Sequence, residues 1–198
     1  MARTRRFDPA LLPSAPDLTY ESKLWRSNCL RVAGIDEAGR GALAGPVAAA
    51  AAILPADEAI AGELGGVRDS KQMTARQRGN WAARIKQAAL AWGVGLASCQ
   101  EIDAMGIVAA TLLAAQRALD ALQITPDYLL LDGSLCIARP IPQTSLVKGD
   151  GRSLSIADDV WVWTMLGLTY DALGDKQAAE SCYARVEGRE PQSERVTD

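Results

Sequence analysis

The chain has 198 residues, of which 48% are hydrophobic and 23% are charged, and its formal net charge is −3. This composition is that of a soluble globular protein, and the length allows one well-filled domain with a small appendage. The negative charge argues against binding nucleic acid through overall charge alone. The absence of histidine excludes Ser-His-Asp and Cys-His catalysis. If the chain is an enzyme, carboxylates with a hard cation are the best remaining solution.

The first 29 residues are predicted to form a loosely attached leader, because they are polar and hold Pro9, Pro13 and Pro16. The basic start MARTRR is not followed by an apolar core, so no secretory signal is expected. The four cysteines lie far apart and fit neither a zinc site nor a disulfide scaffold. The longest apolar run is broken by Pro46 and is too short to span a membrane. We therefore expect a cytoplasmic protein.

Two strands joined by a tight turn are predicted to open the domain. Residues 30–35 form an apolar run, and PVAAAAAIL at 46–54 follows a Gly-Arg-Gly turn, which favours a hairpin. Asp36 and Glu37 lie side by side after the first strand, where their charges repel each other. Either both side chains lie in a solvated turn, or a positively charged group binds between them.

Helices and further strands are predicted to alternate along the rest of the domain. Thr74 is a plausible N-cap for a helix, and the apolar spacing from Val108 to Leu122 predicts an amphipathic helix that Pro126 ends. Short strands are predicted at WGVGLAS (92–98), DYLLLD (127–132) and within QTSLVKGD (143–150). Together with the hairpin, this order indicates an α/β domain with a partly antiparallel sheet.

Carboxylates follow three of these predicted strands: Asp36 with Glu37, then Asp132, then Asp150. In open α/β sheets, ligands gather at strand ends, so these side chains are expected to converge. A cluster of carboxylates is stable only with cations, and its chemical use is two-metal phosphoryl transfer. The alternative is that Asp and Glu are simply common turn residues after strands. Four of them in glycine-flanked turns, without histidine, favour the site.

The same residues resemble the signature of a known family. VAGIDEAGRG at 32–41, followed by LAGPV at 43–47, is similar to the signature of type 2 ribonuclease H, the bacterial ribonuclease HII. The resemblance continues in order from about residue 30 to residue 157. The further segments are DSK (69–71), EID (101–103), ATLLAAQRAL (110–119), LLLDG (129–133) and VKGDGRSLSIA (147–157).

This resemblance implies a fold, an activity and a site. The fold is a ribonuclease H-like mixed sheet flanked by helices. The family cleaves the RNA strand of RNA–DNA hybrids and cuts at ribonucleotides embedded in duplex DNA, and it uses Mg²⁺ or Mn²⁺. By the resemblance, the catalytic and metal-binding positions are Asp36, Glu37, Asp132 and Asp150.

Substrate contacts are also implied. Gly39, Arg40 and Gly41 match the turn whose main chain reads the ribose 2′-hydroxyl, the group that distinguishes RNA from DNA. Alone, such a turn would be an ordinary one with a solvated arginine. Lys71 and Lys148 are candidate phosphate contacts, and the alternative for each is a plain surface lysine.

After residue 157 the sequence departs from this family, because its Tyr-Pro-Thr loop and closing helices are missing. Residues 158–191 resemble instead a single tetratricopeptide repeat, with Trp163, Gly167 and Tyr170 at its pattern positions. This predicts a catalytic domain at 30–157, an antiparallel helical hairpin at 158–191 that could contact a protein partner, and a frayed tail at 192–198. Two functions remain open: an endoribonuclease, or a weak or inactive remnant whose hairpin binds protein.

Overall fold

The computed structural model describes residues 16–40, 45–66, 75–133, 135–147, 149 and 152–156, and for residues 75–79 it describes the backbone only. The predicted hairpin at 158–191 and the tail at 192–198 therefore lie outside the described residues. No helix in the described part of the chain is both long enough and apolar enough to cross a lipid bilayer.

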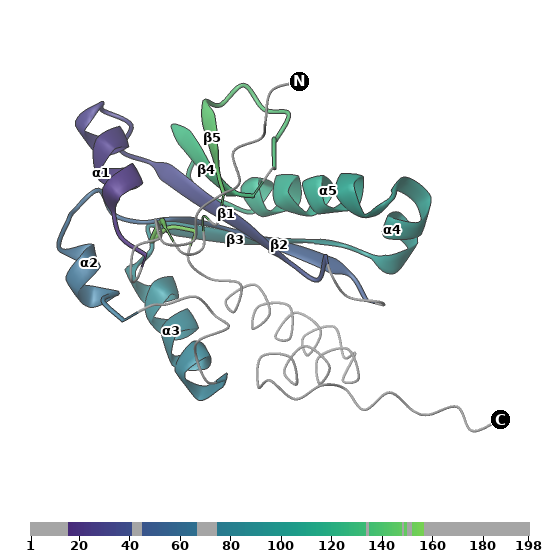
Figure 1. Ribbon diagram of the computed structural model, residues 1–198, viewed down its shortest axis with the longest axis horizontal. Helices are drawn as coiled ribbons and strands as arrows, with labels where there is room; N and C mark the ends of the chain where they lie inside the picture. The colour runs from purple at the N-terminus through teal and green to yellow at the C-terminus, as the bar shows by residue number, and fades with distance from the viewer. Residues whose placement is uncertain are drawn as a thin grey trace, which may run out of the picture.

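Five strands form one sheet in the order β3-β2-β1-β4-β5 (Figure 1). Their bounds are β1 Val32–Ala38, β2 Val47–Ile53, β3 Ala91–Ala97, β4 Tyr128–Asp132 and β5 Gln143–Leu146. The first three strands pair antiparallel, whereas β4 is parallel to both β1 and β5. This arrangement confirms the predicted hairpin and the mixed sheet.

Five helices flank the sheet within the described residues. Their bounds are α1 Thr19–Arg26, α2 Ile60–Glu63, α3 Ala75–Ala88, α4 Cys99–Met105 and α5 Ile107–Asp120. The helices α3 and α5 are the two that the sequence pattern predicts. The pattern misses α4, which begins with a capping box between Ser98 and Glu101 and ends at Gly106 with a φ of 81°.

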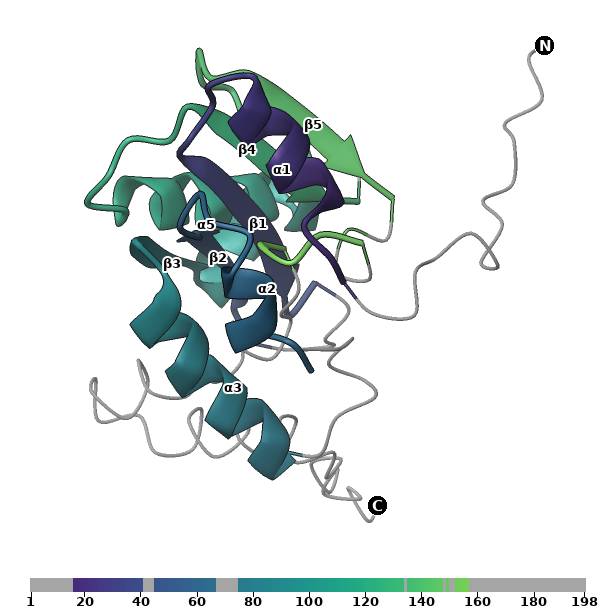
Figure 2. The same ribbon diagram turned by 90° about the vertical axis from the view of Figure 1, so that its left-hand side faces the viewer.

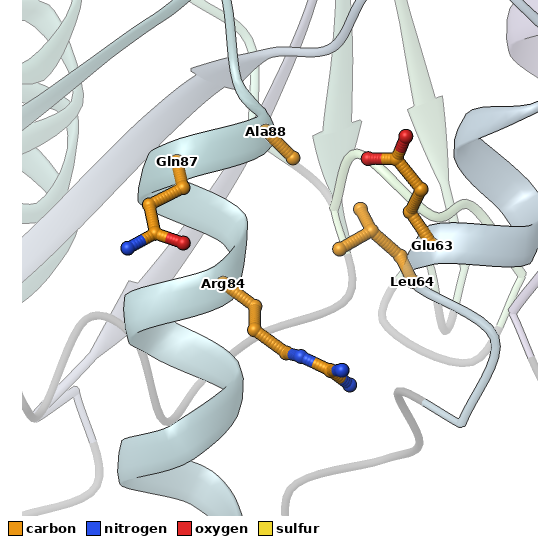
Figure 3. Close-up of a pocket in the computed structure, with 5 residues that line it drawn as sticks. All are labelled: Glu63, Leu64, Arg84, Gln87 and Ala88. Carbon is orange, nitrogen blue, oxygen red and sulfur yellow. The ribbon is translucent and has the colours of Figure 1, made fainter.

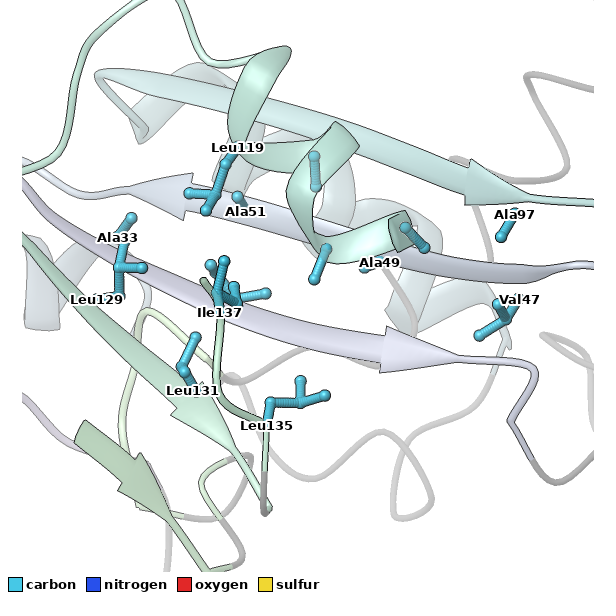
Figure 4. Close-up of a cluster of buried hydrophobic side chains, with 14 of the residues drawn as sticks. Ala33, Val47, Ala49, Ala51, Ala97, Leu119, Leu129, Leu131, Leu135 and Ile137 are labelled. Atoms are coloured by element: carbon cyan, nitrogen blue, oxygen red, sulfur yellow. The ribbon is translucent and has the colours of Figure 1, made fainter. Parts of the chain in front are cut away.

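Helix α5 packs on one face of the sheet and buries an alanine stripe (Figure 4). The sequence pattern predicts a bulkier face that includes Val108, but this side chain is 58% exposed. Ala110, Ala114 and Ala118 are fully buried instead. The reason is close approach: a Cβ at Gly95 of β3 would lie 2.1 Å from the carbonyl oxygen of Ala114. Small side chains on both elements let the helix backbone touch the strand.

Helices α1 and α2 lie on the opposite face of the sheet from α5 (Figure 2). The prediction of a loosely attached leader is wrong for this part of the chain. Helix α1 is packed in the domain: Tyr20, Leu24 and Trp25 contact a cluster formed by Val32 and by three residues of the later chain, and Glu21 is fully buried. These apolar side chains recur at helical spacing, a signal hidden in the sequence by the neighbouring prolines.

Candidate active site

Two of the predicted carboxylates end neighbouring parallel strands. Ile35 of β1 pairs with Leu131 of β4, so Asp36 and Asp132 are the next residues on two adjacent strands. Because side chains alternate along a strand, both carboxylates share the face of the sheet on which α1 lies. Adjacent strands are about 4.8 Å apart, so the two carboxylates are brought close together.

The local environment of Asp36 is unusual for a carboxylate. Its side chain is only 5% exposed, and its Oδ1 accepts a 2.7 Å hydrogen bond from the main-chain N–H of Glu37. Burying a carboxylate beside a second one costs free energy unless a cation compensates both charges. This donor set of carboxylate oxygens is the one that Mg²⁺ and Mn²⁺ prefer, so Asp36 and Asp132 fit a hard divalent cation.

Glu37 is directed differently from its sequence neighbour. Strand alternation places it with Ile35, on the face that α5 covers, and it pairs with Ala49 of β2. Its Oε1 lies 3.3 Å from Arg40 Nη1, in an ion pair within the turn. Gly39, between the two, has a φ of 93°, a conformation that glycine adopts without strain. The adjacent Asp-Glu pair is thus divided by the pleat of the strand.

Asp132 is tied to the chain that follows β5. Its Oδ1 accepts a 2.6 Å hydrogen bond from the main-chain N–H of Gly149. A Cβ at Gly149 would lie 3.0 Å from the same oxygen, so a larger residue would crowd this contact. The contact fixes the carboxylate of Asp132 at the end of its strand.

The remaining predicted site residues lie outside the described residues: Asp150, Gly41, Lys71 and Lys148. In the part of the chain that the structure describes, no three acidic or thiol side chains form a metal-binding group. The structure therefore places Asp36 and Asp132 together on one face of the sheet, whereas Glu37 lies on the other face of β1 and pairs with Arg40 of the turn. The complete set of four carboxylates stays a prediction.

A pocket of about 290 Å³ lies elsewhere, between α2 and α3 (Figure 3). Glu63 and Leu64 form one wall, and Arg84, Gln87 and Ala88 of α3 form the other. Among the predicted site residues that the structure describes, none lines this pocket. The carboxylates at the strand ends are therefore the better candidate for chemistry.

The family model of ribonuclease HII matches residues 33–157, which include these strand-end carboxylates. The chain belongs to the ribonuclease HII family. A curated ribonuclease HII from Syntrophotalea carbinolica is 50% identical over 140 residues, which are 71% of this chain. The chain spans 65% of the length of that relative. This membership confirms the resemblance inferred from the signature segments.

Solved structures share the fold of this ribonuclease HII family member. The ribonuclease H2 of Pyrococcus horikoshii has a TM-score of 0.56 at 21% identity, covering 79% of this chain and 98% of that one. A structure of Bst-RNase HIII in complex with Mn²⁺ has a TM-score of 0.55 at 20% identity, covering 81% and 63%. These similarities confirm the predicted ribonuclease H-like fold.

The EID segment of this ribonuclease HII family chain has a structural role that the sequence did not reveal. Arg117 of α5 donates hydrogen bonds to both carboxylate oxygens of Glu101, at 3.0 and 2.7 Å, and a third to the carbonyl oxygen of Leu96. The Arg117 guanidinium, followed by the main-chain N–H of Ser98, lowers the pKa of Glu101 from 4.5 to about 2. Through these bonds, Arg117 of α5 links Glu101 of α4 to Leu96 of β3.

Proposed function

We propose that this chain is a metal-dependent endoribonuclease. It hydrolyses the RNA strand of RNA–DNA hybrids and cuts at ribonucleotides embedded in duplex DNA, as its family does. The observation that carries the proposal is the pair Asp36 and Asp132, which end adjacent parallel strands on one face of the sheet. The 54% and 50% identities with two curated ribonuclease HII proteins support the same activity. We place the protein in the cytoplasm.

The cofactor of this proposal is Mg²⁺ or Mn²⁺, held by Asp36 and Asp132 with Glu37 and Asp150. When bound, two such cations activate a water molecule and stabilise the leaving oxygen of a phosphodiester. The carboxylates of the chain would hold the cations in place. Because Asp36 is buried, solvent screens its charge poorly, which strengthens its attraction for a cation. The Bst-RNase HIII structure, which contains Mn²⁺, supports this choice of ion class.

The substrate contacts of the proposal lie in the turn after β1. The main chain of Gly39 and Gly41 approaches the ribose 2′-hydroxyl, and Arg40 stays paired with Glu37 through the 3.3 Å contact. Lys71 and Lys148 hold phosphates and position the duplex without reading its sequence. Binding is then expected to weaken with salt, although the net charge of the chain is −3.

A cleavage assay tests the proposal. Duplex DNA with one embedded ribonucleotide is incubated with the full chain and millimolar Mn²⁺, and the matched controls are EDTA and an all-DNA duplex. We expect a single cut on the 5′ side of the ribonucleotide that leaves a 3′-hydroxyl and a 5′-phosphate. A 2′,3′-cyclic phosphate would contradict the proposal, because it would mean attack by the substrate's own 2′-hydroxyl.

A second candidate function has one observation in its favour. The family model ends at residue 157, while the chain continues to residue 198. We propose, as the alternative, a weak or inactive remnant whose 158–191 hairpin contacts a protein partner. Absence of cleavage by the full chain, together with unchanged Mn²⁺ binding, would favour this alternative over the endoribonuclease.

A further inference from the structure

Glu21 is a buried carboxylate outside the site described above. It lies on α1, and its side chain is fully buried. Its Oε1 accepts a 2.7 Å hydrogen bond from the hydroxyl of Ser153 and a 2.8 Å bond from the main-chain N–H of Ser155. Its Oε2 is buried and has no hydrogen-bond partner among the described residues.

Stability of the fold alone does not explain why a carboxylate is buried at this position. A buried carboxylate with one unsatisfied oxygen stabilises a fold less than a well-packed apolar side chain of similar size would. The carboxylate does fix the position of the later segment, because its Oε1 accepts hydrogen bonds from both the Ser153 hydroxyl and the Ser155 main-chain N–H. Figure 2 shows residues 152–156, in light green, passing beside the N-terminal end of α1.

A continuous path of hydrogen bonds leads from Glu21 to the site. Ser153 donates its hydroxyl to Glu21 Oε1 and its main-chain N–H to the carbonyl oxygen of Gly149, at 2.9 Å. Gly149 in turn donates its own N–H to Asp132 Oδ1, at 2.6 Å. Each of these contacts joins residues that the structure describes.

The same segment is anchored at two further points. The N–H of Leu154 donates to the carbonyl oxygen of Asp17 at 2.9 Å, just before α1. The backbone of Ser155 lies directly on Gly34 of β1, because a Cβ there would be 2.1 Å from the Ser155 carbonyl oxygen. Gly34 precedes Asp36 by two residues on the same face of the strand. The segment therefore contacts β1 directly and is linked to Asp132 of β4 through Gly149.

We propose that Glu21 is a positioning residue for the carboxylate of Asp132, acting through Ser153 and Gly149. The inference rests on the proposed divalent-cation site. Removing a group that orients a metal ligand through hydrogen bonds, without touching the metal, typically lowers metal affinity ten- to a hundredfold. Glu21 is thus expected to tune cation affinity without touching the cation or the substrate.

The experiment measures the apparent Kd of the full chain for Mn²⁺, the probe, from the electron paramagnetic resonance signal of the free ion. Glu21→Ala is expected to weaken Mn²⁺ binding about tenfold or more. Glu21→Gln keeps an oxygen acceptor at the same place, so its Kd should stay near the wild-type value. Equal losses in both variants would overturn the inference, because the charge and not the hydrogen-bonded position would then matter.

Two controls separate positioning from general destabilisation. Ile60→Ala removes a buried side chain of α2, only 4% exposed, and should lower the melting temperature while leaving the Kd unchanged. Glu63→Ala removes an exposed carboxylate from the same helix and should change neither quantity. A Kd for Ile60→Ala that rises as much as that of Glu21→Ala would contradict a positioning role.

Ser153→Ala decides the question even if Glu21→Ala does not fold. It removes the hydroxyl bond and keeps the Ser155 bond, so a smaller loss in the same direction is expected. Unchanged Mn²⁺ affinity in folded Ser153→Ala would overturn the inference. If the wild-type chain binds no Mn²⁺ at all, the proposed function fails and takes the inference with it. If the wild type binds Mn²⁺ and the Glu21→Ala and Ser153→Ala variants bind it equally well, the inference alone fails.

Discussion

Replacing Gly34 by alanine tests whether the backbone contact behind Asp36 matters for the site. A Cβ at this position would lie 2.1 Å from the Ser155 carbonyl oxygen and 2.2 Å from its carbonyl carbon. The first distance is 1.3 Å less than the 3.4 Å at which ordinary van der Waals contact begins. Both neighbours are backbone atoms, so no flexible side chain can move aside. The segment 152–156 must move away from β1.

The magnitude follows from overpacking. Extra methyl groups in a well-packed interior cost about 1–3 kcal/mol, and a backbone clash of this size belongs at the upper end. For a chain of this length, each kcal/mol lowers the melting temperature by roughly 2–4 °C. Gly34→Ala is therefore expected to melt about 6–12 °C below the wild type. Because the displaced segment leads back to Gly149, the affinity for Mn²⁺ should fall as well.

Two other glycines give matched controls for the assay, which combines thermal melting with Mn²⁺ titration. A Cβ at Gly95 would also lie 2.1 Å from a backbone oxygen, that of Ala114, but on the α5 face of β3. Gly95→Ala should thus lose a similar amount of stability and keep its Mn²⁺ affinity. Gly62 has nothing within 4 Å of a Cβ, so Gly62→Ala should melt as the wild type does or slightly higher.

The result that would refute this reasoning is specific. If Gly34→Ala melts within experimental error of Gly62→Ala, the Ser155 backbone does not rest on β1 as described. If Gly34→Ala and Gly95→Ala lose Mn²⁺ affinity equally, the loss reflects destabilisation and not the position of the segment behind the site.

Four further predictions concern the site, the ion pair and the C-terminal segment. Millimolar Mn²⁺ should raise the melting temperature, since binding to the folded state alone stabilises it, and Asp132→Asn should erase most of that rise; an equal rise in the variant would remove Asp132 from the site. Arg40→Ala should weaken substrate binding only modestly, because the proposed 2′-hydroxyl contacts come from main chain, and a complete loss would show that the guanidinium itself binds substrate. The pKa of Glu101 is lowered from 4.5 to about 2 in the folded state, so its ion pair with Arg117 stabilises the fold above pH 4.5 and loses that effect as the pH falls toward 2. Glu101→Gln should therefore lower the melting temperature at pH 7, and it should lower it progressively less below pH 4.5. A loss of melting temperature that does not depend on pH would contradict this. Deleting residues 158–198 should lower the melting temperature if the predicted hairpin packs on the sheet, whereas a soluble fragment with unchanged melting would show a free appendage.

The sequence predicts the sheet well because its strands carry strong local signals. The short apolar runs ending at Ile53 and Asp132, with glycine-rich turns, place β2 and β4 correctly. Helix α1 is missed, because three nearby prolines suggest a leader and only the tertiary contacts of Glu21 and Trp25 show otherwise. Helix α4 is missed because it is short and none of its residues is buried.

The sequence predicts that the site carboxylates lie at strand ends, but it does not predict on which face of the sheet each one lies. Sequence order puts Asp36 and Glu37 together, yet the strand divides them between two faces. The pairing of Asp36 with Asp132 depends on the parallel register of β1 and β4, which no local pattern encodes. The role of Glu21 depends on a contact with residues 132 positions later, which is equally hidden.

That long separation has a consequence for the synthesis of the chain. Ribosomes add about 5–20 residues per second, so Ser153 emerges roughly 7–26 s after Glu21. During this interval α1 holds a carboxylate whose hydrogen-bond donors do not yet exist, and burying it on the growing sheet is unfavourable. Helix α1 should therefore remain undocked until Ser153 and Ser155 are available. Helix α1, the earliest of the described helices, would be among the last to dock, and the chain would assemble its carboxylate site only near the end of folding.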